Sequence, residues 1–335
     1  MKAYKGFNLD MTCRRFQFEE GKTYEESEAI LCKKGFHACT NPIDCLRYYK
    51  SHKSVYHEVE LEDVVTDTIR KTELDTKICG KKITIGKKLT IDDIVNISFS
   101  QIMKERENCQ TICDLEFVND RFICCSTQEN SSKLINNVTS TVFTKSDETI
   151  NVSDGSNIVM CSSGISLVNT SRYNIIYNDH GSNSITNSSE YNIIVNTASF
   201  VAINCMTTYC SIISNANSGN IKITSGTDTH IKGDGNCIHS LGTNNSISVK
   251  GNNNKLFING TNNIISVEGK NNRLFITGTN EFKVSEGTVV SLVTAFIPNG
   301  DTFSDSRIIV ARENSEIKPN VRYCYRSECL IEINM

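Results

Sequence analysis

Apolar residues recur every nine positions along about half of the chain, and this spacing constrains the fold more than any other feature. In the first stretch the recurring position holds Ile158, Leu167, Ile176, Ile185, Ile194, Ile203, Ile212 and Ile221. After a shift of register, glycine recurs at the same interval at Gly233, Gly242, Gly251, Gly260, Gly269, Gly278 and Gly287. A short fixed period is typical of a solenoid, in which each unit buries its apolar side chains against its neighbours. The sequence therefore predicts a repeat domain over residues 151–290.

Some side chains repeat at twice this interval. Tyr173, Tyr191 and Tyr209 lie eighteen residues apart, and so do Phe257 and Phe275. Nine residues have room for one strand of about five residues, at about 3.3 Å per residue, and a tight turn. Two strands then form one coil of eighteen residues. The predicted fold class is mainly β, a parallel β-solenoid with two nine-residue strands per coil and two unlike faces.

Alternation along each strand predicts which side chains point into the solenoid. The inward pairs of the later coils are expected to be Ile247 and Val249, Leu256 and Ile258, Ile265 and Val267, and Leu274 and Ile276. The residues between them are expected to point outward.

Asparagine occupies the predicted turns. One column comprises Asn244, Asn253, Asn262, Asn271 and Asn280, and the next comprises Asn245, Asn254, Asn263 and Asn272. Asn and Gly adopt left-handed backbone conformations more readily than other residues, and stacked identical amides can hydrogen-bond along a column. We therefore expect asparagine ladders to connect successive coils.

The rest of the chain divides into three parts. Residues 1–105 are predicted to form a small α+β domain, and residues 106–150 a linker with the first, irregular coils. Residues 291–335 lose the repeat and contain two expected strands, over 307–311 and 320–325. They are predicted to form a C-terminal β cap or oligomerisation segment, because an open solenoid end exposes apolar side chains and unpaired backbone.

Local signals predict the elements of the first domain. Strands are expected over 2–7, 35–39 and 54–61. Three helices are expected to begin at the capping-box pattern Thr23-Tyr24-Glu25-Glu26, at the pair Asn41-Pro42 and at Thr90. Thr and Asn side chains accept hydrogen bonds from the free N–H groups of a first helical turn, and proline has no N–H that needs a partner.

Composition excludes several classes of protein. The net charge of −3 over 335 residues provides no basic excess for a phosphate backbone, so nucleic acid is not the expected partner. No charged start precedes an apolar run, and no apolar stretch of about 20 residues is present, so neither a secretory signal nor a membrane span is expected. Fifteen cysteines in such a chain are expected to be reduced thiols, which favours a cytoplasmic location.

Three kinds of chemical site find little support in the sequence. Calcium-binding repeats need Asp in the turn, but here Asn or Thr stands there, as in Gly242-Thr243-Asn244-Asn245. Polysaccharide-cleaving solenoids need paired carboxylates, but the acids of this repeat are scattered. No Cys-x-x-Cys pair occurs among the possible zinc ligands Cys13, Cys32, His37, Cys39 and Cys45. Cysteines of this kind are more commonly buried free thiols. We predict no metal and no cofactor.

Four residues of the first domain are the candidates for catalysis: Lys5, His37, Glu58 and Glu60. Three segments distantly resemble, in order, the motifs of ADP-ribosyltransferases: Tyr4-Lys5-Gly6, Phe36-His37-Ala38-Cys39 and Glu58-Val59-Glu60. That family has Arg or His, then Ser-Thr-Ser, then a Glu-x-Glu pair whose last acid positions the ribose. Lys5 and His37-Ala38-Cys39 depart from the pattern, and both glutamates also fit the solvent side of an alternating strand. Transferase activity is therefore kept as an alternative.

The first 90 residues resemble an uncharacterised domain found in phage and bacterial proteins. The matching segments are 1–8 (MKAYKGFN), 16–22 (FQFEEGK), 32–39 (CKKGFHAC) and 80–83 (GKKI). The resemblance implies a phage or prophage origin and a cytosolic setting, and it implies no activity.

The preferred hypothesis is a non-enzymatic scaffold that binds a protein partner through one solenoid face. A row of outward apolar residues marks an interface, and the residues expected in this row are Ile175, Tyr177, Ile193, Val195, Ile213, Phe257 and Phe275, with Lys255 and Arg273 at its border. We expect a homodimer or other homo-oligomer. Occlusion of a host protein, either an anti-phage defence protein or another, is the role we favour. A virion fibre or spike component is the third hypothesis.

Overall fold

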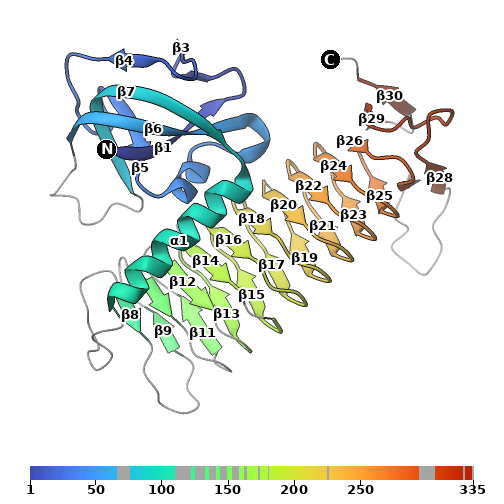
Figure 1. Ribbon diagram of the computed structural model, residues 1–335. Helices are drawn as coiled ribbons and strands as arrows, with labels where there is room; N and C mark the ends of the chain where they lie inside the picture. Colours follow the sequence, from blue (N-terminus) through green and yellow to red (C-terminus); the bar gives the residue numbers. More distant parts are fainter. Residues whose placement is uncertain are drawn as a thin grey trace. The chain divides into compact units, whose positions relative to one another are not determined.

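The computed structural model describes residues 1–65, 76–109, 122–124, 133–135, 141–143, 149–152, 158–161, 164–172, 174–179, 181–224, 226–293, 306–326 and 329–333. The chain forms two compact units, Met1–Val118 and Asn119–Met335. Both are rich in strands, as Figure 1 shows.

Four strands of the first unit close into a small antiparallel barrel. The barrel strands are β1 (Lys2–Asn8), β5 (Phe36–Cys39), β6 (Ser54–Val65) and β7 (Lys77–Leu89). The sheet order is β4-β7-β5-β1-β6, and a further pairing of β7 with β6 completes the ring. The short strand β4 (Thr23–Glu25) pairs with β7, while β2 (Thr12–Cys13) and β3 (Phe16–Gln17) form a separate hairpin.

The interior of this barrel is apolar. Its fully buried side chains include Ala3 and Phe7 of β1, Leu61 of β6 and Ile83 of β7. Because side chains alternate along a strand, Lys5 lies on the same face of β1 as Ala3 and Phe7. A cation therefore stands beside the apolar core, at the position where the sequence placed a catalytic candidate.

Two of the three predicted helix starts are confirmed. Asn41 caps the 3-10 helix η1 (Pro42–Arg47), and its side-chain oxygen accepts a hydrogen bond from the Ile43 N–H at 3.2 Å. Thr90 precedes α1 (Ile91–Cys109). The Thr90 hydroxyl accepts from the Asp93 N–H at 3.1 Å, and the Asp93 carboxylate accepts from the Thr90 N–H at 2.8 Å, which is the reciprocal arrangement of a capping box. A second 3-10 turn is η2 (Ser51–Lys53).

The predicted helix at Thr23 is wrong. Thr23, Tyr24 and Glu25 instead form β4 and pair with Thr84, Ile83 and Lys82 of β7. Tyr24 also packs its ring against Phe18 at 5.1 Å. Pairing with a strand distant in sequence outweighed the local capping signal, as tertiary context commonly does.

The second unit is a parallel β-solenoid whose strands alternate between two sheets (Figure 1). The even sheet contains β8 (Phe122–Cys124), β10 (Thr141–Phe143), β12 (Ile158–Cys161), β14 (Ile175–Asn178), β16 (Ile193–Asn196), β18 (Ser211–Ser214), β20 (Asp228–Lys232), β22 (Ser246–Lys250), β24 (Ile264–Glu268) and β26 (Asn280–Val284). The odd sheet contains β9 (Lys133–Ile135), β11 (Thr149–Val152), β13 (Ser166–Asn169), β15 (Ser184–Asn187), β17 (Ala202–Cys205), β19 (Asn220–Ile223), β21 (Cys237–Ser240), β23 (Lys255–Asn259), β25 (Arg273–Thr277) and β27 (Val289–Val293).

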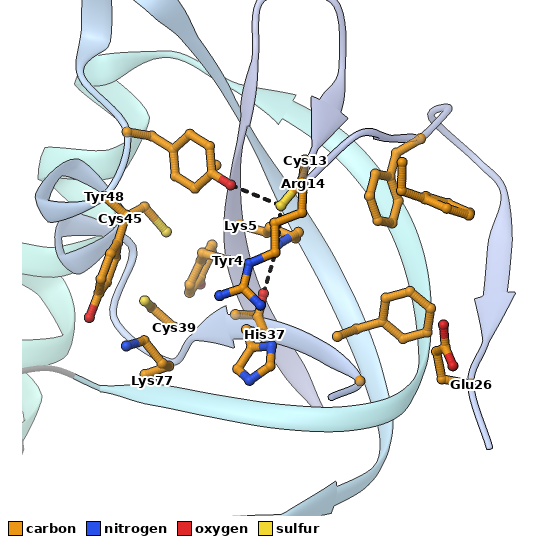
Figure 2. A pocket seen from close by; sticks show the side chains of 17 residues that line it. Tyr4, Lys5, Cys13, Arg14, Glu26, His37, Cys39, Cys45, Tyr48 and Lys77 are labelled. Carbon is orange, nitrogen blue, oxygen red and sulfur yellow. Dashed lines mark hydrogen bonds between the residues drawn. The ribbon is translucent and has the colours of Figure 1, made fainter. Parts of the chain in front are cut away.

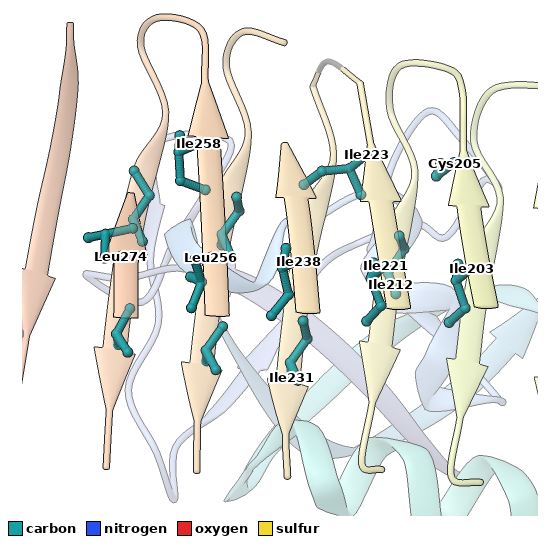
Figure 3. Packing of buried hydrophobic residues seen from close by; sticks show 14 of the residues in the cluster. Ile203, Cys205, Ile212, Ile221, Ile223, Ile231, Ile238, Leu256, Ile258 and Leu274 are labelled. Atoms are coloured by element: carbon teal, nitrogen blue, oxygen red, sulfur yellow. The ribbon is translucent and has the colours of Figure 1, made fainter. Parts of the chain in front are cut away.

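The coil of eighteen residues is confirmed by the register. Ile176 pairs with Ile194, and Ile194 pairs with Ile212, within the even sheet. Side chains from both sheets point toward each other between the layers (Figure 3). They form one buried apolar cluster that contains Leu167, Ile176, Ile185, Ile194, Ile203, Ile212, Ile221, Ile247, Val249, Leu256, Ile258, Ile265, Val267, Leu274 and Ile276. These are the predicted inward residues.

Ile158 does not occupy the inward column to which the nine-residue spacing assigned it. Ile158 pairs with Ile175, whereas Val159 pairs with Ile176 and is fully buried in the core cluster. The turn between β12 and β13 is one residue shorter than the regular spacing requires, so Val159 takes the inward position.

The shift of register between the two halves of the repeat lies after β19. Ile212 pairs with Thr229 and Ile221 pairs with Ile238, so each partner is seventeen residues away rather than eighteen. The interval from Ile221 to Thr229 is therefore eight residues. One shortened turn explains why the repeated positions change while the stacking of strands continues.

The asparagine ladders are present in the turns. Asn244, Asn253, Asn262 and Asn271 have left-handed backbone, with φ between 56° and 60°. The next column is buried, and the side-chain oxygen of each asparagine accepts a backbone N–H from the preceding coil, such as Asn245 N–H to Asn263 Oδ1 at 2.9 Å.

Asn280 belongs to the buried column, not to the left-handed column in which the sequence placed it. Its Oδ1 accepts the Asn263 N–H at 3.0 Å, and its side chain is buried. Because the turn before Asn280 is one residue shorter, the interval to Asn263 is seventeen residues, and Asn280 continues the buried ladder.

Glycines of the later turns bring successive coils into close contact. At Gly260, where φ is +151°, an added Cβ would lie 2.0 Å from the Gly242 carbonyl oxygen. Gly251 meets Gly233 in the same way at 2.1 Å. Only a residue without a side chain fits such an approach.

Antiparallel strands follow the last coils. β28 (Ser306–Val310) pairs with β27, β29 (Arg322–Arg326) pairs with β26, and β30 (Cys329–Glu332) pairs with β29. Ala311, Ile317 and Tyr323 are buried within the solenoid's core cluster. The two predicted C-terminal strands are therefore confirmed.

Candidate functional site

The first unit contains a cavity of about 500 Å³ beside β1 and β5 (Figure 2). β1 and β5 are paired at one position, Tyr4 with Cys39, whereas seven residues of β1 pair with β6. The barrel wall is thus weakly joined between β1 and β5. Residues of β1, β5, the β2–β3 hairpin and η1 surround the resulting space.

Lys5 is a buried cation in the lining of this cavity. The residue is 7% exposed. Its Nζ donates to the His37 carbonyl at 3.0 Å and to Cys13 Sγ at 3.6 Å, and lies 5.3 Å from the centroid of the Phe7 ring. Within the described ranges Lys5 forms no ion pair with a carboxylate. A buried charge that lacks an opposite charge is unusual, because its desolvation is costly.

His37 lies next to Lys5 and is held in its neutral form. Its Nε2 accepts the Cys32 N–H at 2.8 Å. Burial lowers the pKa of His37, and the positive charges of Lys5, Arg14 and Lys77 lower this pKa further, against a hydrogen bond to Gly35. The ring therefore supports the loop around Cys32.

A strained turn presents Arg14 to the cavity. Arg14 and Arg15 form the two-residue turn between β2 and β3, with φ of 48° and 70°. Turns of this kind prefer Asn-Gly, because left-handed backbone is unfavourable for long side chains. Arg14 lines the cavity. Figure 2 shows its side chain extending toward His37.

A thiol and a phenol meet at another part of the lining. Cys13 Sγ lies 2.9 Å from the Tyr49 hydroxyl. Burial, and then the contact with Cys13, raise the pKa of Tyr49 far above its ordinary value. The hydroxyl therefore stays protonated at neutral pH.

The two glutamates of the transferase-like pattern lie outside the cavity. Glu58 Oε1 is 3.0 Å from Lys2 Nζ and 3.6 Å from Lys87 Nζ. Glu60 is exposed and stands opposite Lys2 in the β1–β6 ladder. Neither lines the cavity. The structure thus brings together Lys5 and His37, two of the four catalytic candidates, and leaves Glu58 and Glu60 apart from them.

The apolar row expected on the early coils is not exposed. Ile175, Tyr177, Ile193, Val195 and Ile213 are 1–3% exposed, although they lie outside the solenoid's core cluster. β14 and β16 are buried at every position. Continuous apolar runs of this kind are typical of strands covered on both faces. The prediction that these five side chains form a free surface is therefore wrong.

The early and late apolar residues also lie on different sheets. Ile175, Ile193 and Ile213 belong to even strands, whereas Phe257 and Phe275 belong to β23 and β25 of the odd sheet. A single row through all of them does not exist, because each step of nine residues moves the chain to the other sheet.

The odd sheet carries a ladder of stacked rings on its outer surface. His239 stacks on Phe257 with ring centroids 4.8 Å apart, and Phe257 stacks on Phe275 at 4.7 Å. Each ring is partly exposed. The outward direction predicted for both Phe residues is confirmed. His239 was missed, although it stands eighteen residues before Phe257.

Cations border this ring ladder. Lys255 and Arg273 are neighbours in the adjacent outward column, and both are exposed. Lys222 is exposed and pairs with His239, which extends the ring column. The surface formed by Lys222, His239, Lys255, Phe257, Arg273 and Phe275 is named the ring-ladder face below.

The tyrosine column is confirmed where it is described. Tyr191 and Tyr209 stack with ring centroids 5.4 Å apart and planes 7° from parallel. Tyr173, the third member, lies outside the described residues. Both described tyrosines have positive φ, so the column runs along a turn.

In the described parts of the chain, no three His, Cys, Asp or Glu side chains are grouped closely enough to hold a metal ion. Among those same residues, no helix has both the length and the apolar character needed to cross a bilayer.

Residues 1–97 match a domain of unknown function, DUF7666. No curated protein and no solved structure matches the chain.

Proposed function

We propose that this protein is a non-enzymatic scaffold that binds a protein partner through the ring-ladder face of its solenoid. The observation that carries the proposal is the stack of His239, Phe257 and Phe275 beside Lys255 and Arg273. Aromatic residues and arginine are enriched at protein interfaces and among the residues that contribute most to binding.

The geometry of the stack favours a protein over a nucleic acid. Phe257 has a ring stacked on each of its faces, so its edge is the surface available to a partner, whereas bases bind aromatic side chains by stacking on their faces. The chain's net charge of −3 also provides no general attraction for phosphate. The partner surface that fits is apolar at its centre and acidic at its border.

A rigid backbone suits this role. Main-chain pairing to the strands on either side fixes Phe257 and Phe275 before any partner arrives. Binding then requires little ordering of loops, which otherwise lowers affinity.

We also propose where this protein originates and which kind of host protein it binds. The resemblance of the first domain to phage and bacterial sequences supports a phage-encoded protein that acts in the host cytoplasm. Within this proposal the scaffold occludes a host protein, for which a defence protein is the preferred candidate. Self-association through the same face would give a homodimer.

A double variant tests the proposal. Phe257→Ser with Phe275→Ser should leave the melting temperature almost unchanged and abolish capture of a partner or lower the oligomer mass measured by light scattering. Phe200→Ser is the matched control, because Phe200 is 73% exposed and lies in a turn, away from the ring-ladder face. Equal binding and equal mass for the double variant and the native chain would refute the assignment of this face.

One observation favours a second candidate, an ADP-ribosyltransferase-like activity of the first unit. Lys5 and His37 meet in a cavity, as that alternative requires, whereas Glu60 lies outside it. Incubation with labelled NAD and bacterial lysate tests it. Label transfer that Glu60→Gln abolishes would support the enzyme, and absence of transfer would remove it.

A further inference from the structure

Three cations converge on the cavity of the first unit. Lys5, Arg14 and Lys77 all line it, and Glu26 is the one acidic residue of the lining. The pKa of His37, which lies between them, is lowered by each of the three charges. The lining of the cavity therefore contains more cationic than anionic side chains.

Lys5 is the member for which this imbalance matters most. An ammonium group has three N–H donors, and two of them are directed at the His37 carbonyl and Cys13 Sγ. Neither acceptor carries the full negative charge that a buried cation needs. An anion in the cavity would provide both the missing charge and the third acceptor.

Arg14 reaches the cavity at a cost in backbone energy. Left-handed backbone is unfavourable for a residue with a side chain, and Arg14 and Arg15 both adopt it. Strain of this kind is concentrated at ligand-binding sites. Of the two arginines, Arg14 lines the cavity and Arg15 does not.

Aromatic residues form much of the remaining lining. Tyr4, Phe16, Phe36, Tyr48 and Tyr49 contribute rings to the lining. Lys77 Nζ lies 4.4 Å from the centroid of the Tyr48 ring, so cation and ring are adjacent. A volume of about 500 Å³ falls within the range of about 300–1,000 Å³ that is typical of small-molecule sites.

We propose that this cavity binds a small phosphorylated aromatic molecule, of the mononucleotide class, with the phosphate between Lys5 and Arg14 and the planar ring against the tyrosine and phenylalanine walls. Phosphate fits the paired donors of a guanidinium and the point charge of an ammonium. This site is separate from the ring-ladder face, and the inference goes beyond the proposed function.

Calorimetric titration of the full chain with three compounds tests the proposal. Adenosine 5′-monophosphate contains both groups, adenosine contains only the ring system, and inorganic phosphate contains only the anion. We expect the monophosphate to bind at least about tenfold more tightly than either of the others, because two charge-assisted contacts add to the ring contacts. Binding of none of the three at millimolar concentration would overturn the proposal.

Paired variants locate the site. Arg14→Gln should weaken binding of the monophosphate about tenfold, while Arg15→Gln, with the same change of charge in the same turn, should leave binding unchanged. Equal losses in the two variants would show a general effect of surface charge and would overturn the assignment. Both residues are exposed, so the fold is retained in either variant.

Lys5→Met adds a second line of evidence. This variant should abolish phosphate-dependent binding without lowering the melting temperature, because a buried cation without an ion pair is replaced by an apolar chain of similar length. Unchanged affinity for the monophosphate in Lys5→Met would contradict the proposal. The affinity of the Phe257→Ser, Phe275→Ser variant should equal that of the native chain, which separates this site from the partner face.

Discussion

The rings of Phe257 and Phe275 lie 4.7 Å apart with their planes 6° from parallel. This distance equals the spacing of about 4.7–4.9 Å between neighbouring strands of a sheet. Residues in register on adjacent strands therefore stack without further adjustment. The period of the sequence determines the geometry of the ring-ladder face.

Replacing Ile194 by Asp should unfold part of the solenoid. Ile194 is fully buried between the sheets, and an unpaired buried carboxylate costs several kcal/mol. Urea unfolding followed by circular dichroism should show a loss of that size. Ser184→Asp is the control, because Ser184 is exposed on β15, and a similar midpoint for both variants would refute the inward position of Ile194.

Replacing Gly260 by Ala should destabilise the solenoid more than the same change at Gly287. Both glycines have positive φ, at +151° and +78°, but an added Cβ at Gly260 lies 2.0 Å from the Gly242 carbonyl, whereas Gly287 has no atom within 4 Å. Because φ of +151° is also the more strained backbone for alanine, the difference between the two melting temperatures reports the steric contact and this strain together. Equal melting temperatures would mean that the coils separate easily.

Replacing Asn263 by Ala should be more costly than replacing its neighbour Asn262. Asn263 Oδ1 accepts from the Asn245 N–H, and Asn263 Nδ2 donates to Asn280 Oδ1 at 2.8 Å and to the Gly242 carbonyl at 3.0 Å. Each buried group left without a partner costs about 1–3 kcal/mol. The Asn262 side chain is exposed, and the role of this residue is to adopt the left-handed backbone conformation of the turn. Thermal unfolding of the two variants should rank them in this order, and the reverse order would contradict a structural role for the buried ladder.

The stability of the first unit should fall as the pH decreases below about 6.5. Burial, with the charges of Lys5, Arg14 and Lys77, lowers the pKa of His37 below its ordinary value in the folded chain. Below about pH 6.5 the unfolded chain therefore binds a proton that the folded chain does not, and stability decreases until the folded pKa is reached. Melting temperatures between pH 7.5 and pH 5 should show a smaller slope for His37→Gln than for the native chain. Identical slopes would mean that His37 does not contribute.

Most of the solenoid could be predicted from the sequence, because its determinants are local and repeated. Residues eighteen apart, such as Ile176 and Ile194, become neighbours through the period alone. The exceptions arise where a turn loses a residue, as at Val159 and Asn280, and a regular count then assigns the wrong column. His239 followed the period but was not recognised, because an isolated imidazole carries no apolar signal.

The first unit could be predicted less well, because distant pairing determines it. Thr23 carries a helix-capping signal, yet its strand is formed by pairing with Thr84. The cavity lining combines residues from β1, a hairpin, β5 and η1, and their proximity depends on closure of the barrel. A resemblance in the sequence indicates Lys5 and His37, whereas Arg14 gives no sequence signal beyond its charge.

The antiparallel strands β28 and β29 end the parallel ladders at β27 and β26. A second molecule cannot add its own first strand in parallel register to an edge that is already occupied in the opposite direction. Duplication of eighteen residues upstream would lengthen the rod by one rung and leave this terminus unaltered. Growth by gene-internal duplication is thus open to such a chain, while β26 and β27 are not available to the first strands of a second molecule.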